Sequence, residues 1–458
     1  VEVQANQVLI ATDQPYMEDW IANLEHNVAP KKIQRVLLSP EQLQRYMVEY
    51  YQVSRAVSNS QKSGSYDRDN KGVEALLQLG DSQNPDANDQ HIVKLVDWVL
   101  QFAFEQGASD IHLEPRKDNG KVRFRIDGVL HTIYNMPANT LTAVISRIKI
   151  LGRMNVAEKR KPQDGRLKTR TPKGQETELR LSTLPTAFGE KLVMRIFDPE
   201  VLVRSFQQLG FEGHLLSDWQ ALTSHSHGII LVTGPTGSGK TTTLYSSLKQ
   251  LATEQVNVCT IEDPIEMLEP SFNQMQVNTG IDLGFADGVR ALMRQDPDII
   301  MVGEIRDHDT ANMAIQAALT GHLVLSTLHT NDAPSSLTRL HDLGVQPFLT
   351  AATILGVLAQ RLVRRLCPHC KVEKQINSQE WEHLTFDYIM EMPEKVFTAV
   401  GCEECRQTGY KGRVGIYEFM PVSLEAKQLI GANGDLTALR QQAKKEGIEP
   451  LRIAGARK

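Results

Sequence analysis

The stretch GPTGSGKT, residues 234–241, has the composition of a phosphate-binding loop. It fits the spacing G-x-x-x-x-G-K-[ST], in which glycines let successive backbone N–H groups point at phosphate oxygens. In this pattern Lys240 reaches the β- and γ-phosphates and takes part in catalysis, and the hydroxyl of Thr241 ligates Mg²⁺. The residues expected to bind ATP are therefore Gly234, Pro235, Thr236, Gly237, Ser238, Gly239, Lys240, Thr241 and Thr242.

Hydrolysis of a bound nucleotide needs a carboxylate that orients water, and DIIMVGE supplies Glu304. Glu304 stands at the carboxyl end of an expected buried strand, where ligands of open α/β sheets bind, so we predict that it positions the water. Asp298 begins the same stretch and is either a turn residue or a functional one. TIEDPIE adds Glu262, Asp263 and Glu266, which form a solvated loop or, as we predict, part of the Mg²⁺ and water shell. Beside a polyphosphate, such carboxylates would be repulsive unless they held metal or water.

Two histidines, His322 and His329, flank the apolar run in GHLVLSTLHT. A single histidine is usually an ordinary polar residue. Two that flank one buried strand in this part of the chain favour a role in sensing the γ-phosphate. We therefore predict that His322 binds the nucleotide and that His329 is catalytic.

Four of the five cysteines form two pairs, in CPHC and CEEC. Two such pairs supply four thiolates, the tetrahedral set that Zn²⁺ prefers in closed structural sites. We predict a structural zinc site and no catalysis by the metal. The predicted ligands are Cys367, Cys370, Cys402 and Cys405; His369 is expected to be an exposed neighbour and Cys259 a small buried side chain.

These residues must be positioned by a larger framework of strands and helices. Residues 206–458 alternate near-continuous apolar runs with helical stretches, which indicates a parallel sheet covered on both faces. A segment at about 366–410 holds the cysteines as an insertion. Residues 89–200 mix helices with alternating strands and predict a small α+β domain. Residues 1–55 predict part of an α/β domain, and the polar residues 56–88 predict a flexible linker with a short helix at VEALLQL.

Composition restricts the classes of function. The formal net charge is −5, so no global positive field draws the chain to nucleic acid or to an anionic membrane. No apolar run reaches about 18 residues, and the first residues lack the pattern of a signal peptide. Any association with a membrane is therefore expected to depend on partners.

In these motifs, the chain resembles the family of type II secretion and type IV pilus assembly ATPases. GPTGSGKT is similar to the Walker A motif of that family, TIEDPIE to its Asp box, RQDPDIIMVGEIRD to its Walker B region and TGHLVLSTLHTNDA to its His box. ASDIHLEP, RKPQDGR, LPTAFGEK and the cysteine pairs also match. The resemblance covers roughly residues 90–458 and is weaker over the first 55 residues.

The resemblance implies a RecA-like P-loop ATPase domain, preceded by an α+β PAS-like N2 domain and a partial N1-type α/β domain, in a homo-hexamer. It also implies that Arg180 in LRLS and Arg195 in VMRIFD reach the ATP of the neighbouring subunit. Lys191 stands where the family usually has arginine, and we assign it no catalytic role. The basic run RMNVAEKRKPQDGRLKTRTPK is either a solvated surface or a subunit interface that includes Arg166.

The expected function is that of a hexameric cytoplasmic motor, peripheral at the inner membrane, that hydrolyses ATP to assemble pilins or pseudopilins. Its expected partner is an inner-membrane platform protein, contacted by the zinc element, and no nucleic acid is expected. Two alternatives stay open: a DNA-translocating RecA-like ATPase and a scaffold that binds nucleotide without hydrolysis.

Overall fold

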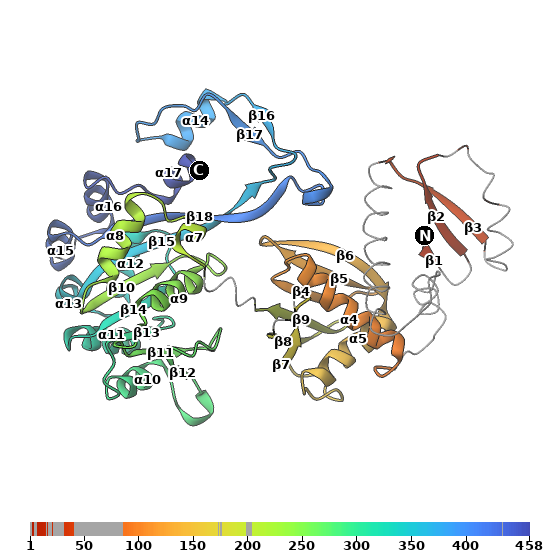
Figure 1. The fold of residues 1–458 in the computed structure, drawn as a ribbon, viewed down its shortest axis with the longest axis horizontal. Coiled ribbons are helices and arrows are strands. Elements are labelled where there is room, and N and C mark those ends of the chain that lie inside the picture. Colours follow the sequence, from red (N-terminus) through yellow and green to blue (C-terminus); the bar gives the residue numbers. More distant parts are fainter. Residues whose placement is uncertain are drawn as a thin grey trace. The chain divides into compact units, whose positions relative to one another are not determined.

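The computed structural model describes residues 2–3, 7–14, 16, 21, 32–40 and 86–458, except 173, 175, 198–203 and 433. The chain divides into two compact units, Val1–Phe197 and Asp198–Lys458. Figure 1 labels the elements of both. The predicted helices of the first 55 residues, the linker up to residue 85 and the short helix VEALLQL lie outside the described residues. No described helix is long and apolar enough to cross a membrane.

The first described strands form a three-stranded sheet in the order β1-β2-β3. β2 pairs with β1 in antiparallel and with β3 in parallel orientation. All three strands lie within residues 1–55, which the sequence predicts to be part of an α/β domain. The bounds are β1 (Glu2–Val3), β2 (Gln7–Thr12) and β3 (Lys32–Leu37).

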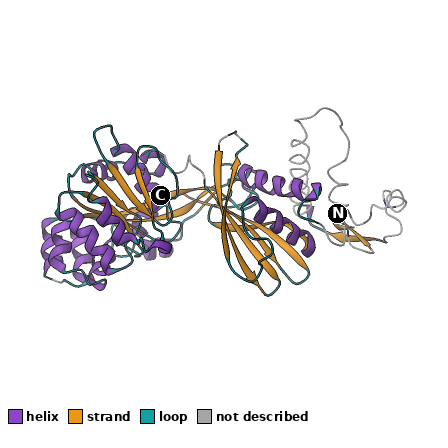
Figure 2. Cartoon of the chain, turned by 90° about the horizontal axis from the view of Figure 1, so that it is seen from below, coloured by secondary structure: helices purple, strands orange, loops and turns teal. Residues whose placement is uncertain are grey.

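Between Gln90 and Ile196, the described residues of the first unit form a six-stranded antiparallel sheet in the order β6-β5-β4-β9-β8-β7, with two helices on one face (Figure 2). Alternating apolar residues, such as Val122 and Phe124 in β5, pack against α4 and α5, while the charged residues between them lie on the other face. The bounds are α4 (Gln90–Glu105), β4 (Asp110–Pro115), β5 (Asn119–Ile126), β6 (Val129–Pro137), α5 (Ala138–Leu151), β7 (Gln163–Arg170), β8 (Glu176–Thr186) and β9 (Gly189–Ile196).

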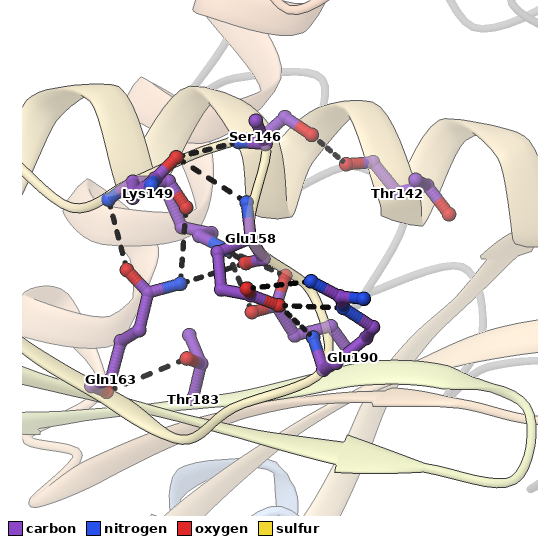
Figure 3. Close-up of polar contacts among 10 residues, drawn as sticks. Thr142, Ser146, Lys149, Glu158, Gln163, Thr183 and Glu190 are labelled. Atoms are coloured by element: carbon purple, nitrogen blue, oxygen red, sulfur yellow. Dashed lines mark hydrogen bonds and ion pairs between the residues drawn. The ribbon is translucent and has the colours of Figure 1, made fainter.

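A buried lysine connects α5 to two other segments of this unit (Figure 3). The Nζ of Lys149 lies 2.7 Å from Oε1 of Glu190 in β9 and donates to the backbone carbonyl of Glu158 at 2.8 Å. The side-chain amide of Gln163 donates to the same carbonyl. These contacts fix the backbone of the basic run, whose Lys159, Arg160 and Lys161 side chains are exposed.

The second unit is built on a seven-stranded sheet in the order β12-β11-β13-β14-β10-β15-β18. All neighbouring strands are parallel except β15 and β18. Side chains of β10 alternate between two hydrophobic cores, Ile229 and Leu231 on one face and Ile230 and Val232 on the other. The predicted parallel sheet covered on both faces is thus confirmed, with the addition of the antiparallel edge strand β18.

Helices before and between these strands cover the two faces of the sheet (Figure 1). The strands are β10 (Gly228–Thr233), β11 (Val258–Glu262), β12 (Asn273–Gln276), β13 (Ile299–Val302), β14 (Leu323–Leu328), β15 (Ile354–Leu366), β16 (Val372–Lys374), β17 (Val396–Thr398) and β18 (Tyr410–Pro421). The helices are α7 (Phe206–Leu209), α8 (His214–Thr223), α9 (Lys240–Leu251), α10 (Phe285–Leu292), α11 (His308–Leu319), α12 (Ala333–Asp342), α13 (Pro347–Thr353), α14 (Ser378–Thr385), α15 (Leu424–Gly431), α16 (Leu436–Lys445) and α17 (Leu451–Arg457).

Candidate phosphate-binding and catalytic site

The glycine-rich loop joins the carboxyl end of β10 to the start of α9, as the sequence predicts. Gly234, Gly237 and Gly239 all have positive φ, at 147°, 79° and 89°. A Cβ at Gly234 would lie 2.5 Å from the backbone oxygen of Gln360 and 2.6 Å from Oγ of Ser238. Glycine is therefore required at 234 for conformation and for space, and the loop can curl as a phosphate-binding loop does.

Lys240, the first residue of α9, has its ammonium group turned back onto the loop. Its Nζ donates to the backbone carbonyls of Gly234 at 2.8 Å and Pro235 at 3.1 Å. Burial lowers the pKa of Lys240 to about 8, with Glu304 acting in the opposite direction and Arg361 adding to the decrease. A bound polyphosphate would accept these hydrogen bonds and favour the charged form.

Glu304 follows β13 and lies between two potential donors. Its Oε1 is 2.5 Å from Nη2 of Arg306, and its Oε2 is 3.5 Å from Nε2 of His329. Burial and the nearby Lys240 lower the pKa of His329, so the imidazole is neutral near pH 7. β13, β14 and β10 are neighbours in the sheet, and their carboxyl ends bring Glu304, His329 and Lys240 together.

A hydroxyl group holds the His329 loop against the phosphate loop. Oγ1 of Thr233, the last residue of β10, donates to the carbonyl of Leu328 at 3.1 Å and accepts the backbone N–H of Thr330 at 2.9 Å. His329 stands between these two residues. Its backbone is therefore fixed directly beside the start of the loop.

Glu262 is buried in a cluster of neutral donors. Its Oε2 accepts the Tyr245 hydroxyl at 2.6 Å, and its Oε1 accepts the Thr260 hydroxyl at 2.7 Å and the Gln274 amide at 3.2 Å. Burial and the Glu262 carboxylate raise the pKa of Tyr245, which keeps its hydroxyl protonated. Glu262 thus connects β11 to α9 and β12, and a place in the magnesium shell would require part of this network to break.

His322 and Asp298 lie at the amino-terminal ends of their strands, opposite to the ends that meet the phosphate loop. His322 precedes β14, about 20 Å from its carboxyl end at the rise of an extended strand. Nδ1 of His322 lies 2.8 Å from the carbonyl of Ala317, at the end of α11. Asp298 precedes β13 and accepts the backbone N–H of Asn257 at 2.7 Å. Because parallel strands share their direction, neither residue meets the phosphate loop of its own subunit. The predicted nucleotide contact of His322 is therefore not made within one subunit and stays a prediction.

Two arginines near the site were not predicted. Arg306 comes two residues after Glu304, a spacing that could have indicated the pair. Arg361 comes from β15, and its Nη2 donates to the backbone and side-chain oxygens of Asn331 at 3.2 and 3.1 Å. No local pattern marks Arg361, because β15 is more than a hundred residues away from the loop in sequence.

Arg180 and Arg195 are direct cross-strand neighbours on β8 and β9 of the first unit. Leu179, Leu181 and Met194, which alternate with them, face α4 and α5, so both arginines lie on the opposite face of the sheet. Nε of Arg195 is 3.2 Å from Oδ1 of Asp110, and the guanidinium of Arg180 lies over the ring of Phe197 at 4.5 Å. Arg125, Asp110, Arg195, Arg180 and Arg166 follow one register line across five strands.

The four predicted zinc ligands converge between β15 and β18. Their sulfur atoms lie within 4.8 Å of one another, at 3.8 Å for Cys367 to Cys402 and 3.7 Å for Cys370 to Cys405. Four thiolates at about 2.3 Å from one tetrahedral zinc ion are about 3.8 Å apart, so these residues fit the metal. Backbone N–H groups of Cys402 and Gly409 donate to Sγ of Cys405 at 3.2 Å. None of the five cysteines forms a disulfide.

Comparisons with known proteins point to one family. The family described as "Type II/IV secretion system protein" matches residues 85–458. The type IV pilus assembly ATPase TfpB of Acinetobacter baylyi is 80% identical over 458 residues, all of this chain and 78% of that protein. The type II secretion system ATPase E of Vibrio cholerae is 39% identical over 95% of this chain and 89% of its own length. The crystal structure of the pilus retraction motor PilT with bound ADP is 28% identical, with a TM-score of 0.51 over 76% of this chain and 88% of that one. This chain therefore belongs to the type II/IV secretion system protein family.

Proposed function

We propose that this chain is a motor ATPase that hydrolyses ATP to drive pilin or pseudopilin assembly, in type IV pilus extension or type II protein secretion. The observation that carries the proposal is the convergence of Lys240, Glu304 and His329 on the phosphate loop, at the carboxyl ends of three neighbouring strands. The relatives named as pilus assembly and secretion ATPases support the kind of work that hydrolysis drives.

In this mechanism the loop amides and Lys240 hold the β- and γ-phosphates. Glu304 accepts a hydrogen bond from the attacking water and orients it, because its carboxylate is held in place by Arg306 and His329. Thr241, on the first turn of α9, would hold Mg²⁺, which would neutralise charge on the β- and γ-phosphates. The neutral His329 ring can donate to Glu304 or to the γ-phosphate without adding a positive charge.

Arg180 and Arg195 complete the site from the next subunit of a homo-hexamer. A guanidinium placed at the γ-phosphate stabilises charge in the transition state, worth about 10³–10⁵ in rate in well-studied cases. Their position on the sheet face opposite α4 and α5 supports this role, because none of the described helices of their unit covers that face. Closing of the first unit over the neighbour's ATP would then couple hydrolysis to movement.

We also propose an identity for each domain. The second unit is a RecA-like P-loop domain, residues 89–200 form a PAS-like N2 domain, and the first strands are part of an N1-type domain. The tetracysteine segment binds structural Zn²⁺ and contacts an inner-membrane platform protein. The motor then works in the cytoplasm, at the membrane only through partners.

The test is ATPase activity with and without the cytoplasmic part of a candidate platform protein, in the parent and in Glu304→Gln. The proposal predicts activity in the parent, stimulation by the platform fragment, and loss of about 10²-fold or more in the variant in both conditions. Equal hydrolysis by parent and variant would overturn the assignment of Glu304. Stimulation by single-stranded DNA, in place of the platform fragment, would favour a DNA-translocating enzyme.

A further inference from the structure

One buried polar side chain touches the phosphate loop from the neighbouring strand and has no role in the mechanism above. Gln360 lies in β15, which pairs with β10 in parallel so that Ala359 is opposite Thr233. Gln360 is therefore level with Gly234, the first residue of the loop. It is only 2% exposed, although an uncharged amide of this size is usually at the surface.

Both ends of the Gln360 amide are used. Its Nε2 donates to the backbone carbonyl of Ser238 at 2.8 Å, and its Oε1 accepts the hydroxyl of Thr243 at 2.9 Å. Because the donor and the acceptor have different partners, only one orientation of the amide satisfies both. One side chain thus connects the last part of the loop to the first turn of α9.

The hydrogen bond to Ser238 has a direct consequence for anion binding. In a planar trans peptide unit, the carbonyl and the N–H of the following residue point in opposite directions. When Gln360 holds the Ser238 carbonyl on its own side, the N–H of Gly239 must point to the other side. Backbone N–H groups of this loop are the groups that bind phosphate in such a motif.

We propose that Gln360 is a positioning residue that fixes the phosphate loop in its binding conformation before nucleotide arrives. This inference rests on the proposed function, because it assigns Gln360 a role in nucleotide binding. The alternative is that Gln360 only stabilises the fold, as a satisfied buried polar group does.

The test is the dissociation constant of Mg-ADP, measured by isothermal titration calorimetry on the full chain. Gln360→Met keeps the length and burial of the side chain and removes both hydrogen bonds, so affinity should fall roughly tenfold. Thr243→Val removes only the hydroxyl that orients the amide, and affinity should fall about three- to fivefold. The double variant should bind no more weakly than Gln360→Met alone, because both changes act on one contact.

The matched control is Glu418→Gln in β18, the strand paired with β15. Glu418 is also buried, and its carboxylate accepts the backbone N–H groups of Ala333 and Leu451. This control should lower the unfolding temperature and leave the affinity for Mg-ADP unchanged. If Gln360 positions the loop, Gln360→Met lowers the affinity for Mg-ADP, whereas Glu418→Gln, with a comparable loss of stability, does not. If Gln360 has only a structural role, the two variants affect the affinity alike.

The inference is overturned if the parent binds Mg-ADP and both single variants bind it as tightly. It is also overturned if Glu418→Gln weakens binding as much as Gln360→Met does. If Gln360→Met does not fold, Thr243→Val decides the question from the other side of the contact. A parent chain that does not bind Mg-ADP overturns the proposed function and, with it, this inference.

Discussion

Removing the hydrogen bond between Tyr245 and Glu262 tests whether the Glu262 carboxylate has a structural or a catalytic role. Tyr245→Phe removes a 2.6 Å hydrogen bond to a buried carboxylate and changes almost no volume. Hydrogen bonds to charged groups contribute about 1.5–3 kcal/mol, so the expected loss of stability is about 2 kcal/mol. For a domain of this size, that corresponds to a decrease of about 4–8 °C in the unfolding temperature.

The assay combines differential scanning calorimetry with steady-state ATPase kinetics. The control is Tyr417→Phe, because the hydroxyl of the partly buried Tyr417 donates to the neutral carbonyl of Leu209 at 2.7 Å. Its expected loss is smaller, about 1 kcal/mol. We expect Tyr245→Phe to keep kcat within about threefold, since Glu262 retains two donors. A large loss of kcat with an unchanged unfolding temperature would refute the structural reasoning and place Glu262 in the chemical step.

Three further predictions concern the charge state of the site, its histidines and the metal. Binding of Mg-ADP at pH 8.5 should take up about three quarters of a proton, because Lys240, with a pKa of about 8, is partly neutral before binding and becomes charged beside phosphate. Calorimetry in buffers of different ionisation enthalpy measures this proton uptake. Binding without proton uptake would contradict the prediction. His329→Ala should lower kcat at least tenfold, whereas His322→Ala should leave it within about twofold, because only His329 lies beside Glu304. Cys402→Ser should remove the zinc ion found by elemental analysis of the parent and leave basal ATPase activity intact; a parent chain without zinc would contradict the assignment.

The sequence predicts those parts of the site that depend on local pattern and strand direction. The spacing of glycines before Lys240 defines the loop, and apolar runs place Glu304 and His329 at strand ends. In parallel strands these ends meet at one edge, and the structure brings the three side chains together there. Strand direction also predicts that His322, which precedes β14, lies far from His329, which follows it.

Other features depend on contacts between distant segments, and no local pattern encodes them. Glu262 lies in a motif rich in carboxylates, but its partners come from α9 and β12. Gln360 and Arg361 reach the loop only because β15 pairs with β10, which places residues about 120 positions apart side by side. Cysteine spacing is the opposite case, because two CxxC pairs restrict the geometry enough to predict four convergent sulfur atoms.

The central claim is that one ATP is hydrolysed by Glu304 of the subunit that binds it and by Arg195 of the next subunit. The direct test mixes two inactive variants, Glu304→Gln and Arg195→Gln, and measures ATPase activity of the mixed assemblies. Each variant alone should lose activity by about 10²-fold or more. An equal mixture should recover about a quarter of the parent rate, because that fraction of sites joins an intact glutamate to an intact neighbouring arginine. A mixture no more active than either variant alone would contradict the claim.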